Sequence, residues 1–184
     1  MLYQRWYPFW IEKKRNRLSR QNATKKSRKG ELPYQLYFAK EQSKWGRGGV
    51  AFIGHEKAKN ETTIGRMYLI TDKQFSEVVA QENKKDGLDI DLGSVITNGY
   101  QKIDDGWYGT IIYLGDKEGS PMFTFTSNNP NSEMFIKPSP AYLSTIANGL
   151  LELGMSKEDI INYFFDKKGI QGHFPKESLF SYMF

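Results

Sequence analysis

The sequence predicts an α+β fold, in which a small mixed or antiparallel sheet curls into an open β-barrel with flanking helices. Strand-type segments follow one another with one short helix among them, so the regular crossover helices of a doubly wound sheet are missing. Two amphipathic helical segments close the chain. Aromatic residues form 15% of the 184 residues, which indicates a packed core rather than a disordered chain.

The first thirty residues differ from the rest in charge. Residues 1–30 hold ten Lys or Arg and one acidic residue, whereas residues 31–184 carry a net charge of −4. Residues 11–30 have few apolar side chains, so we expect a mobile or weakly helical basic arm there. One domain is expected over residues 31–184. The aromatic start of the chain lacks the apolar run and cleavage site of a secretory signal.

Five strands are expected from runs of β-branched and aromatic residues bounded by Gly, Pro or polar residues. They cover residues 34–39, 48–53, 63–70, 107–114 and 122–126. The last two strands are expected to form a hairpin across Gly115–Gly119. Residues 128–138, rich in Asn and Pro, are expected to be a loop.

A short helix is expected over residues 71–83. Thr71 and Gln74 have the spacing of a capping box, which marks its start. Its apolar face consists of Phe75, Val78 and Val79. Glu82 follows these residues at helical spacing and points along the same face.

A carboxylate directed toward a core either has partners or has a chemical role. Apolar surroundings disfavour its charged form and raise its pKa toward the range of a general base or acid. The alternative is that the last turn, followed by the polar residues 83–87, emerges into water.

Two helices are expected at the end of the chain. The first has Ser139 as its N-cap and Pro140 in its first position, and it stops at Gly154. The second runs from about Ser156 to Gly169. Their inner stripes consist of Leu143, Ile146, Ala147, Leu150 and Leu153, and of Ile160, Ile161 and Phe164.

Composition excludes several classes of site. The chain has no cysteine, which removes disulfide and thiolate chemistry and fits a cytoplasmic protein. His55 and His173 lie far apart without ligand spacing, so no metal site is expected. No apolar run is long enough to span a membrane.

Four segments resemble the gamma-glutamylcyclotransferase-like family in order and spacing. They are the Trp-Gly-Arg-Gly-Gly run and strand at 45–53, the strand at 64–70, the Gln81–Glu82 pair, and Pro-Ser-Pro-Ala-Tyr at 138–142. The resemblance covers roughly residues 32–165. It implies a pocket for a small gamma-glutamyl compound, which family members cyclise to 5-oxoproline with release of an amine or amino acid. It implies no cofactor.

The resemblance also assigns site residues. Glu82 corresponds to the family's key glutamate and would act as general base and then acid. Tyr142, Gly48, Gly49 and Trp45 would bind substrate. The alternative for Tyr142 is an aromatic packing the first turn of its helix, and the alternative for the two glycines is close strand packing.

One family feature is missing from the start of this chain. The family opens with a strand that ends in Tyr-Gly-Ser-Asn, a turn whose backbone N–H groups hold the substrate's carboxylate. Residues 1–10 contain no glycine, and the similar residues 37–43 belong with the following strand. We therefore expect a chain that is truncated or altered at its start, or a catalytically inactive member that binds a small ligand. The lysine and arginine side chains of the arm could provide a substitute site for the substrate's carboxylate.

A third hypothesis is nucleic-acid or polyanion binding through the basic arm. Ten cations in thirty residues bind phosphates with steep salt dependence, and the interleaved aromatic residues can stack on bases. Glu152, Glu158 and Asp159 make the two closing helices a poor surface for DNA. The sequence gives no indication of the oligomeric state or of the leaving group.

Overall fold

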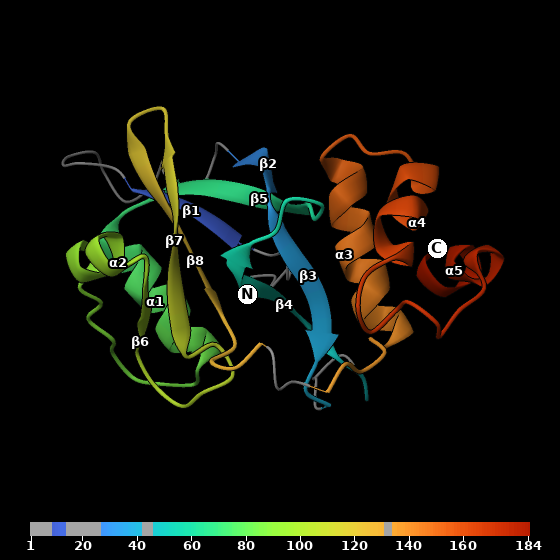
Figure 1. The fold of residues 1–184 in the computed structure, drawn as a ribbon, viewed down its shortest axis with the longest axis horizontal. Coiled ribbons are helices and arrows are strands. Elements are labelled where there is room, and N and C mark those ends of the chain that lie inside the picture. The colour runs from blue at the N-terminus through green and yellow to red at the C-terminus, as the bar shows by residue number, and fades with distance from the viewer. Residues whose placement is uncertain (1–8, 14–26, 42–45, 131–133) are drawn as a thin grey trace. The chain divides into compact units, whose positions relative to one another are not determined.

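The structure, a computed structural model, describes residues 9–13, 27–41, 46–130 and 134–184 (Figure 1). These residues divide into two compact units. The sheet unit contains residues 9–13, 27–30 and 66–128. The helical unit contains residues 31–41, 46–65, 129–130 and 134–184.

The larger of two sheets has six strands in the order β2-β5-β1-β8-β7-β6. The strands are β1 Phe9–Lys13, β2 Ser27–Leu32, β5 Thr63–Ile70, β6 Tyr100–Lys102, β7 Thr110–Lys117 and β8 Ser120–Thr126. In the sheet unit β1 pairs in parallel with β5, from Phe9 opposite Arg66 to Lys13 opposite Ile70, and antiparallel with β8. The sheet is therefore mixed, as predicted.

Strands β7 and β8 form the predicted hairpin, with a tighter turn than expected. The turn residues are Glu118 and Gly119, both with positive φ (51° and 80°). Two consecutive positive φ values are typical of the type I′ turn, whose twist matches that of the flanking strands. Arg28 Nη1 lies 2.7 Å from the Glu118 carboxylate at this turn.

Helix α1, Asp72–Glu82, forms where the capping box predicts it. Thr71 accepts a hydrogen bond from the Gln74 N–H, and the Gln74 side chain accepts one from the Thr71 N–H. Phe75 and Val79 are buried, as predicted, and Val78 is half-buried. The Phe75 ring packs against Phe123 of β8 at 5.9 Å between centroids, which anchors the helix to the sheet.

Helix α2, Leu92–Asn98, was not expected from the sequence. Asp91 caps its start by accepting hydrogen bonds from the N–H groups of Gly93 and Ser94. Gly99, with φ of 81°, ends it and leads into the edge strand β6.

The helical unit combines a two-stranded sheet with three helices. Strands β3, Tyr34–Ala39, and β4, Val50–Lys57, pair antiparallel. Helices α3 Pro140–Glu152, α4 Lys157–Phe165 and α5 Lys176–Met183 pack on one another (Figure 1). Phe38 of β3 lies at the centre of this core, with ring centroids 6.5 Å from Tyr142 and 6.2 Å from Phe164.

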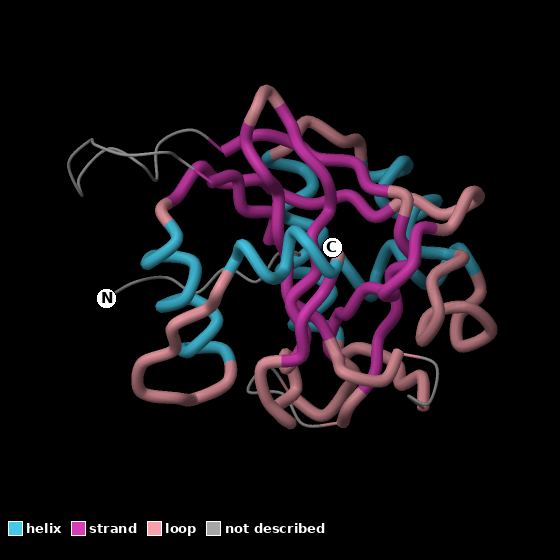
Figure 2. The backbone as a smooth tube through the Cα atoms, turned by 60° about the vertical axis from the view of Figure 1, so that its left-hand side comes forward, coloured by secondary structure: helices cyan, strands magenta, loops and turns pink. Residues whose placement is uncertain are grey.

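The α+β class is confirmed, because strands and helices coexist without a regular crossover pattern (Figure 2). The word barrel fits only loosely, since neither sheet closes on itself in the part of the chain that the structure describes. None of the helices among the described residues is long and apolar enough to cross a membrane.

The expectation of a mobile or weakly helical segment over residues 11–30 is wrong at both ends. Residues 9–13 form β1 and residues 27–32 form β2. The reason is long-range pairing: β1 gains partners on both sides, β5 and β8, and this tertiary pairing outweighs a local composition rich in charge. Residues 14–26 lie outside the described residues.

Candidate active site

Glu82, the predicted catalytic residue, is the last residue of α1 and is half-buried. It follows Phe75 and Val79, which are 1% and 0% exposed, along the inner face of the helix. Glu77 lies on the opposite face and is exposed. The carboxylate of Glu82 is thus set apart from the solvated acid of the same helix.

Beyond Glu82 the chain turns in a Schellman motif. The Lys85 N–H donates to the Ala80 carbonyl at 2.9 Å, and the Lys84 N–H donates to the Gln81 carbonyl at 3.2 Å. This motif requires a left-handed residue, usually glycine, directly after the C-cap. Here Lys84 occupies that position with φ of 55°. A side chain in this conformation costs free energy and persists where the surroundings hold it.

Asn83, the C-cap, clamps the end of α1 to the loop before β7. Its Nδ2 donates to the Tyr108 carbonyl, and its Oδ1 accepts from the Tyr108 N–H, both at 3.1 Å. The same Nδ2 lies 3.1 Å from the Val79 carbonyl. One amide side chain therefore satisfies main-chain groups of both the helix and the loop.

A second attachment joins Lys85 to Asp104 of the same loop. The Lys85 ammonium lies 2.8 Å from the Asp104 carboxylate, which also accepts from the Gly106 N–H. Burial acts to raise the pKa of Asp104, but these two donors and the charge of Lys85 hold it below its usual value. Asn128 donates to the Asp104 carbonyl at 2.8 Å and fixes the loop from its other side.

The predicted substrate-binding tyrosine is buried in the helical unit. Tyr142 is 1% exposed, and its hydroxyl accepts a hydrogen bond from the Ala51 N–H of β4 at 3.0 Å. Its ring meets Phe38 edge-on. These contacts show a packing role, and a place in a substrate pocket stays a prediction.

Gly48 and Gly49 lie against the segment that leads into α3. A Cβ atom at Gly48 would fall 2.4 Å from the Ser139 nitrogen, and one at Gly49 would fall 2.2 Å from the Ile136 oxygen. The glycines thus permit a close backbone approach beside the N-cap of the helix that carries Tyr142. Trp45, the fourth predicted substrate-binding residue, lies outside the described residues.

Gly48, Gly49 and Tyr142 thus belong to the helical unit, whereas Glu82 belongs to the sheet unit. Among the residues that the structure describes, no group of three or more His, Cys, Asp or Glu could hold a metal ion.

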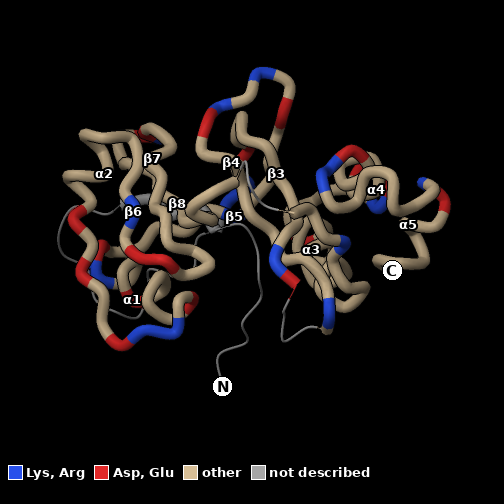
Figure 3. Tube along the Cα trace, turned by 60° about the horizontal axis from the view of Figure 1, so that its bottom comes forward, with Lys and Arg blue, Asp and Glu red and all other residues tan. Residues whose placement is uncertain are grey.

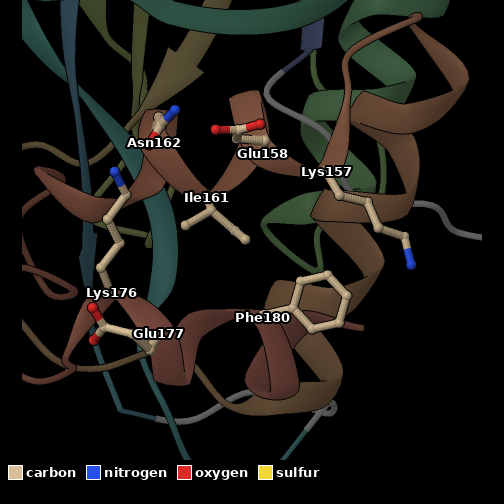
Figure 4. A pocket seen from close by; sticks show the side chains of 7 residues that line it. All are labelled: Lys157, Glu158, Ile161, Asn162, Lys176, Glu177 and Phe180. Atoms are coloured by element: carbon tan, nitrogen blue, oxygen red, sulfur yellow. The ribbon is translucent and has the colours of Figure 1, made fainter.

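A shallow pocket of about 400 Å³ lies between α4 and α5 in the helical unit (Figure 4). Its lining contains none of the predicted site residues. It consists of Lys157, Glu158, Ile161, Asn162, Lys176, Glu177 and Phe180. Lysine and glutamate occur there in equal numbers, so the lining favours neither an anion nor a cation.

The sheet unit is acidic over residues 66–128, which hold ten Asp or Glu and six Lys or Arg. Figure 3 shows acidic residues along α1 and beside β6. The polyanion hypothesis depends on the ten cations of residues 1–30. Lys13, Arg28 and Lys29 lie in β1 and β2, and the other seven lie outside the described residues.

No family model matches this chain. Histone deacetylase 5 from Arabidopsis thaliana is 33% identical to this chain in an alignment 153 residues long, which covers 72% of this chain. The chain spans only 23% of the length of that relative.

Two solved structures are similar to this chain. An uncharacterised protein from Homo sapiens is 17% identical, with a TM-score of 0.47 over 84% of this chain and 83% of its own. A gamma-glutamyl cyclotransferase is 15% identical, with a TM-score of 0.45 over 86% of this chain and 88% of its own. Because both TM-scores lie below 0.5, the activity of this chain stays a proposal.

The catalytic role of Glu82 stays a prediction, and the sequence did not indicate the groups that anchor the end of its helix. The only local signal was the run Asn-Lys-Lys-Asp-Gly at 83–87, since Asn is favoured at helix ends. Nothing local indicated that Asn83 would meet Tyr108, because that contact joins residues 25 positions apart.

Proposed function

We propose that this chain is a gamma-glutamylcyclotransferase-like enzyme, which cyclises a gamma-glutamyl group to 5-oxoproline and releases an amine or amino acid. The observation that carries the proposal is the half-buried Glu82 at the end of a helix anchored to its loop. The same residue is singled out by helical periodicity and by the family's glutamine–glutamate pair. The solved cyclotransferase is similar in its overall fold only.

The proposed reaction begins with the substrate's own α-amine, which is protonated at neutral pH. Glu82 accepts one proton and frees the nitrogen lone pair. The nitrogen attacks the γ-carbonyl carbon, and tethering of both groups in one molecule favours ring closure. As the bond from that carbon to the departing nitrogen breaks, Glu82 returns the proton to the leaving amine. The ring nitrogen gives up its second proton to water and becomes the neutral N–H of 5-oxoproline. Backbone N–H groups would stabilise the oxyanion that forms in between.

Substrate binding is assigned by the resemblance. Tyr142, Gly48, Gly49 and Trp45 are proposed to line the pocket, with no cofactor in the reaction.

The test is a mass-spectrometric assay for 5-oxoproline with a panel of gamma-glutamyl dipeptides and amines. Glu82→Gln keeps the size of the side chain but removes the base, so turnover should fall about 10²–10⁴-fold. Glu77→Gln is the matched control, because it makes the same chemical change on the exposed face of the same helix. Wild-type turnover in Glu82→Gln would refute the mechanism.

A second candidate is a catalytically inactive binding protein with the same fold. The observation in its favour is the missing Tyr-Gly-Ser-Asn turn, without which the substrate's carboxylate loses its expected anion site. Calorimetry distinguishes the two: this candidate binds a gamma-glutamyl compound while no 5-oxoproline forms.

A further inference from the structure

We propose that Asn83 is a positioning residue, which holds Glu82 in a single orientation by tying the end of α1 to the loop before β7. The inference rests on the proposed function for its catalytic meaning. The positioning itself is a property of the folded chain and can be measured without any substrate.

Glu82 occupies the last position of α1. Terminal turns of helices commonly fray, because their last carbonyls lack helical partners. A side chain in a frayed turn samples several rotamers, whereas a general base must stay within reach of one proton. A catalytic carboxylate at the last position of α1 therefore needs a device that prevents fraying.

Asn83 supplies that device. Glu82 and Asn83 share one planar peptide bond, so an anchored Asn83 restricts the movement of the Glu82 backbone. The two hydrogen bonds with Tyr108, both 3.1 Å, point in opposite directions and define the position of the amide plane. The bond to the Val79 carbonyl ties the same amide to the last turn itself.

The strained backbone of the residue after Asn83 also indicates that this turn is held firmly. Lys84 stands at φ of 55° where glycine is usual, and a conformation of this kind persists when its surroundings over-determine it. The ion pair between Lys85 and Asp104, at 2.8 Å, provides the second fixed point. The turn after Glu82 is thus held on both sides of the strained residue.

The loop before β7 leaves space for the Asn83 side chain. A Cβ atom at Gly106 would fall 2.5 Å from the Asn83 Oδ1, so glycine there leaves room for the amide. Gly106→Ala therefore displaces the Asn83 amide without substituting Asn83. It provides a second perturbation in case Asn83→Ala does not fold.

The experiment measures the χ1 rotamer of Glu82 by three-bond NMR couplings in the wild type, Asn83→Ala, Gly106→Ala and Thr71→Ala. Thr71→Ala is the matched control, because it removes the N-cap of the same helix, at the end opposite to the C-cap Asn83. We expect one rotamer in the wild type and in Thr71→Ala, and averaged couplings in the other two. A single rotamer in both clamp variants, or averaging in the wild type, overturns the inference.

Kinetics on the same four proteins adds the catalytic meaning. A misplaced general base lowers kcat more than it raises KM, so we expect kcat to fall about ten- to a hundredfold in the clamp variants, with KM within about threefold. Equal kcat in Thr71→Ala and Asn83→Ala overturns the inference and leaves the proposed function standing. If the wild type converts no substrate, the proposed function fails, while the couplings still decide whether Asn83 positions Glu82.

Discussion

Adding one methyl group at Gly49 tests whether this glycine serves backbone packing. In Gly49→Ala the new Cβ would lie 2.2 Å from the Ile136 oxygen and 3.1 Å from the Ala39 nitrogen. Both neighbours are backbone atoms and cannot rotate away. The Ile136 oxygen must retreat by about 1 Å to reach an ordinary contact distance, so the segment before α3 must move.

The cost follows from the hydrogen bonds that hold this segment. The Gly49 N–H donates to the Lys137 carbonyl, and the Ile136 N–H donates to the Phe38 carbonyl, both at 2.9 Å. Losing both costs about 1–3 kcal/mol, and the overpacking adds about 1–3 kcal/mol. The sum, about 2–6 kcal/mol, is a large part of the 5–15 kcal/mol that is typical of a folded domain.

The assay is urea unfolding followed by circular dichroism, in which a lower midpoint at constant m-value reports lost stability. Gly54→Ala, in the strand β4 that begins directly after Gly49, is the control, because its Cβ would meet nothing nearer than the Gln35 Cβ at 3.9 Å. We expect Gly54→Ala to stay within about 0.5 kcal/mol of the wild type. A change that small in Gly49→Ala would refute the packing argument and strengthen a direct role of this glycine in binding substrate.

Three further predictions concern contacts elsewhere in the two units. Lys84→Gly relieves the left-handed backbone and should raise stability by about 0.5–1 kcal/mol in urea unfolding; a loss would show that the lysine side chain makes compensating contacts. The native pKa of Asp104 is depressed, so its stabilising contribution is complete above about pH 3.9 and is lost as the pH falls through the lower native value. In Asp104→Asn the free energy of unfolding should therefore fall less steeply as the pH drops below about 4. An unchanged slope in a pH series of urea midpoints would contradict this. Tyr142→Phe removes the acceptor of the Ala51 N–H and should cost about 1–2 kcal/mol, measured by thermal unfolding, whereas an unchanged Tm would show that the bond adds nothing.

Elements with local signals could be predicted from the sequence. The capping box of α1, and Ser139 and Pro140 at the start of α3, mark both helices with hydrogen bonds between near neighbours. The hairpin of β7 and β8 also depends on residues that are close in sequence. Its two-residue turn is shorter than the predicted turn across Gly115–Gly119.

Elements that depend on distant partners could not be predicted. Strand β1 is followed by a run rich in charged residues, and its pairing with β5 and β8 makes it a strand. Helix α5 is short, its N-cap Pro175 makes no side-chain hydrogen bond, and it buries only Leu179 and Met183. Such a helix is formed by its contacts with α3 and α4 rather than by its own sequence.

The candidate site shows the same division. The position of Glu82 on the inner face of α1 could be predicted, because helical periodicity is a local property. Its role in catalysis stays a prediction. The hydrogen bonds of Asn83 could not be predicted. In the sequence this asparagine does not differ from any other polar residue after a helix, and its partner Tyr108 is distant along the chain. The arrangement of polar groups around a catalytic side chain is a tertiary property, and a single sequence carries little trace of it.

The parallel pairing of β1 with β5 has a consequence for how the chain folds during synthesis. Residues 9–13 leave the ribosome well before their partners, which are residues 66–70 and 122–123. More than a hundred residues must therefore be made before β1 has both neighbours. Contacts this far apart in sequence slow folding and leave an unpaired strand available to other chains. We expect expression at lower temperature or with added chaperones to raise the soluble yield, and a chain cut before β8 to aggregate.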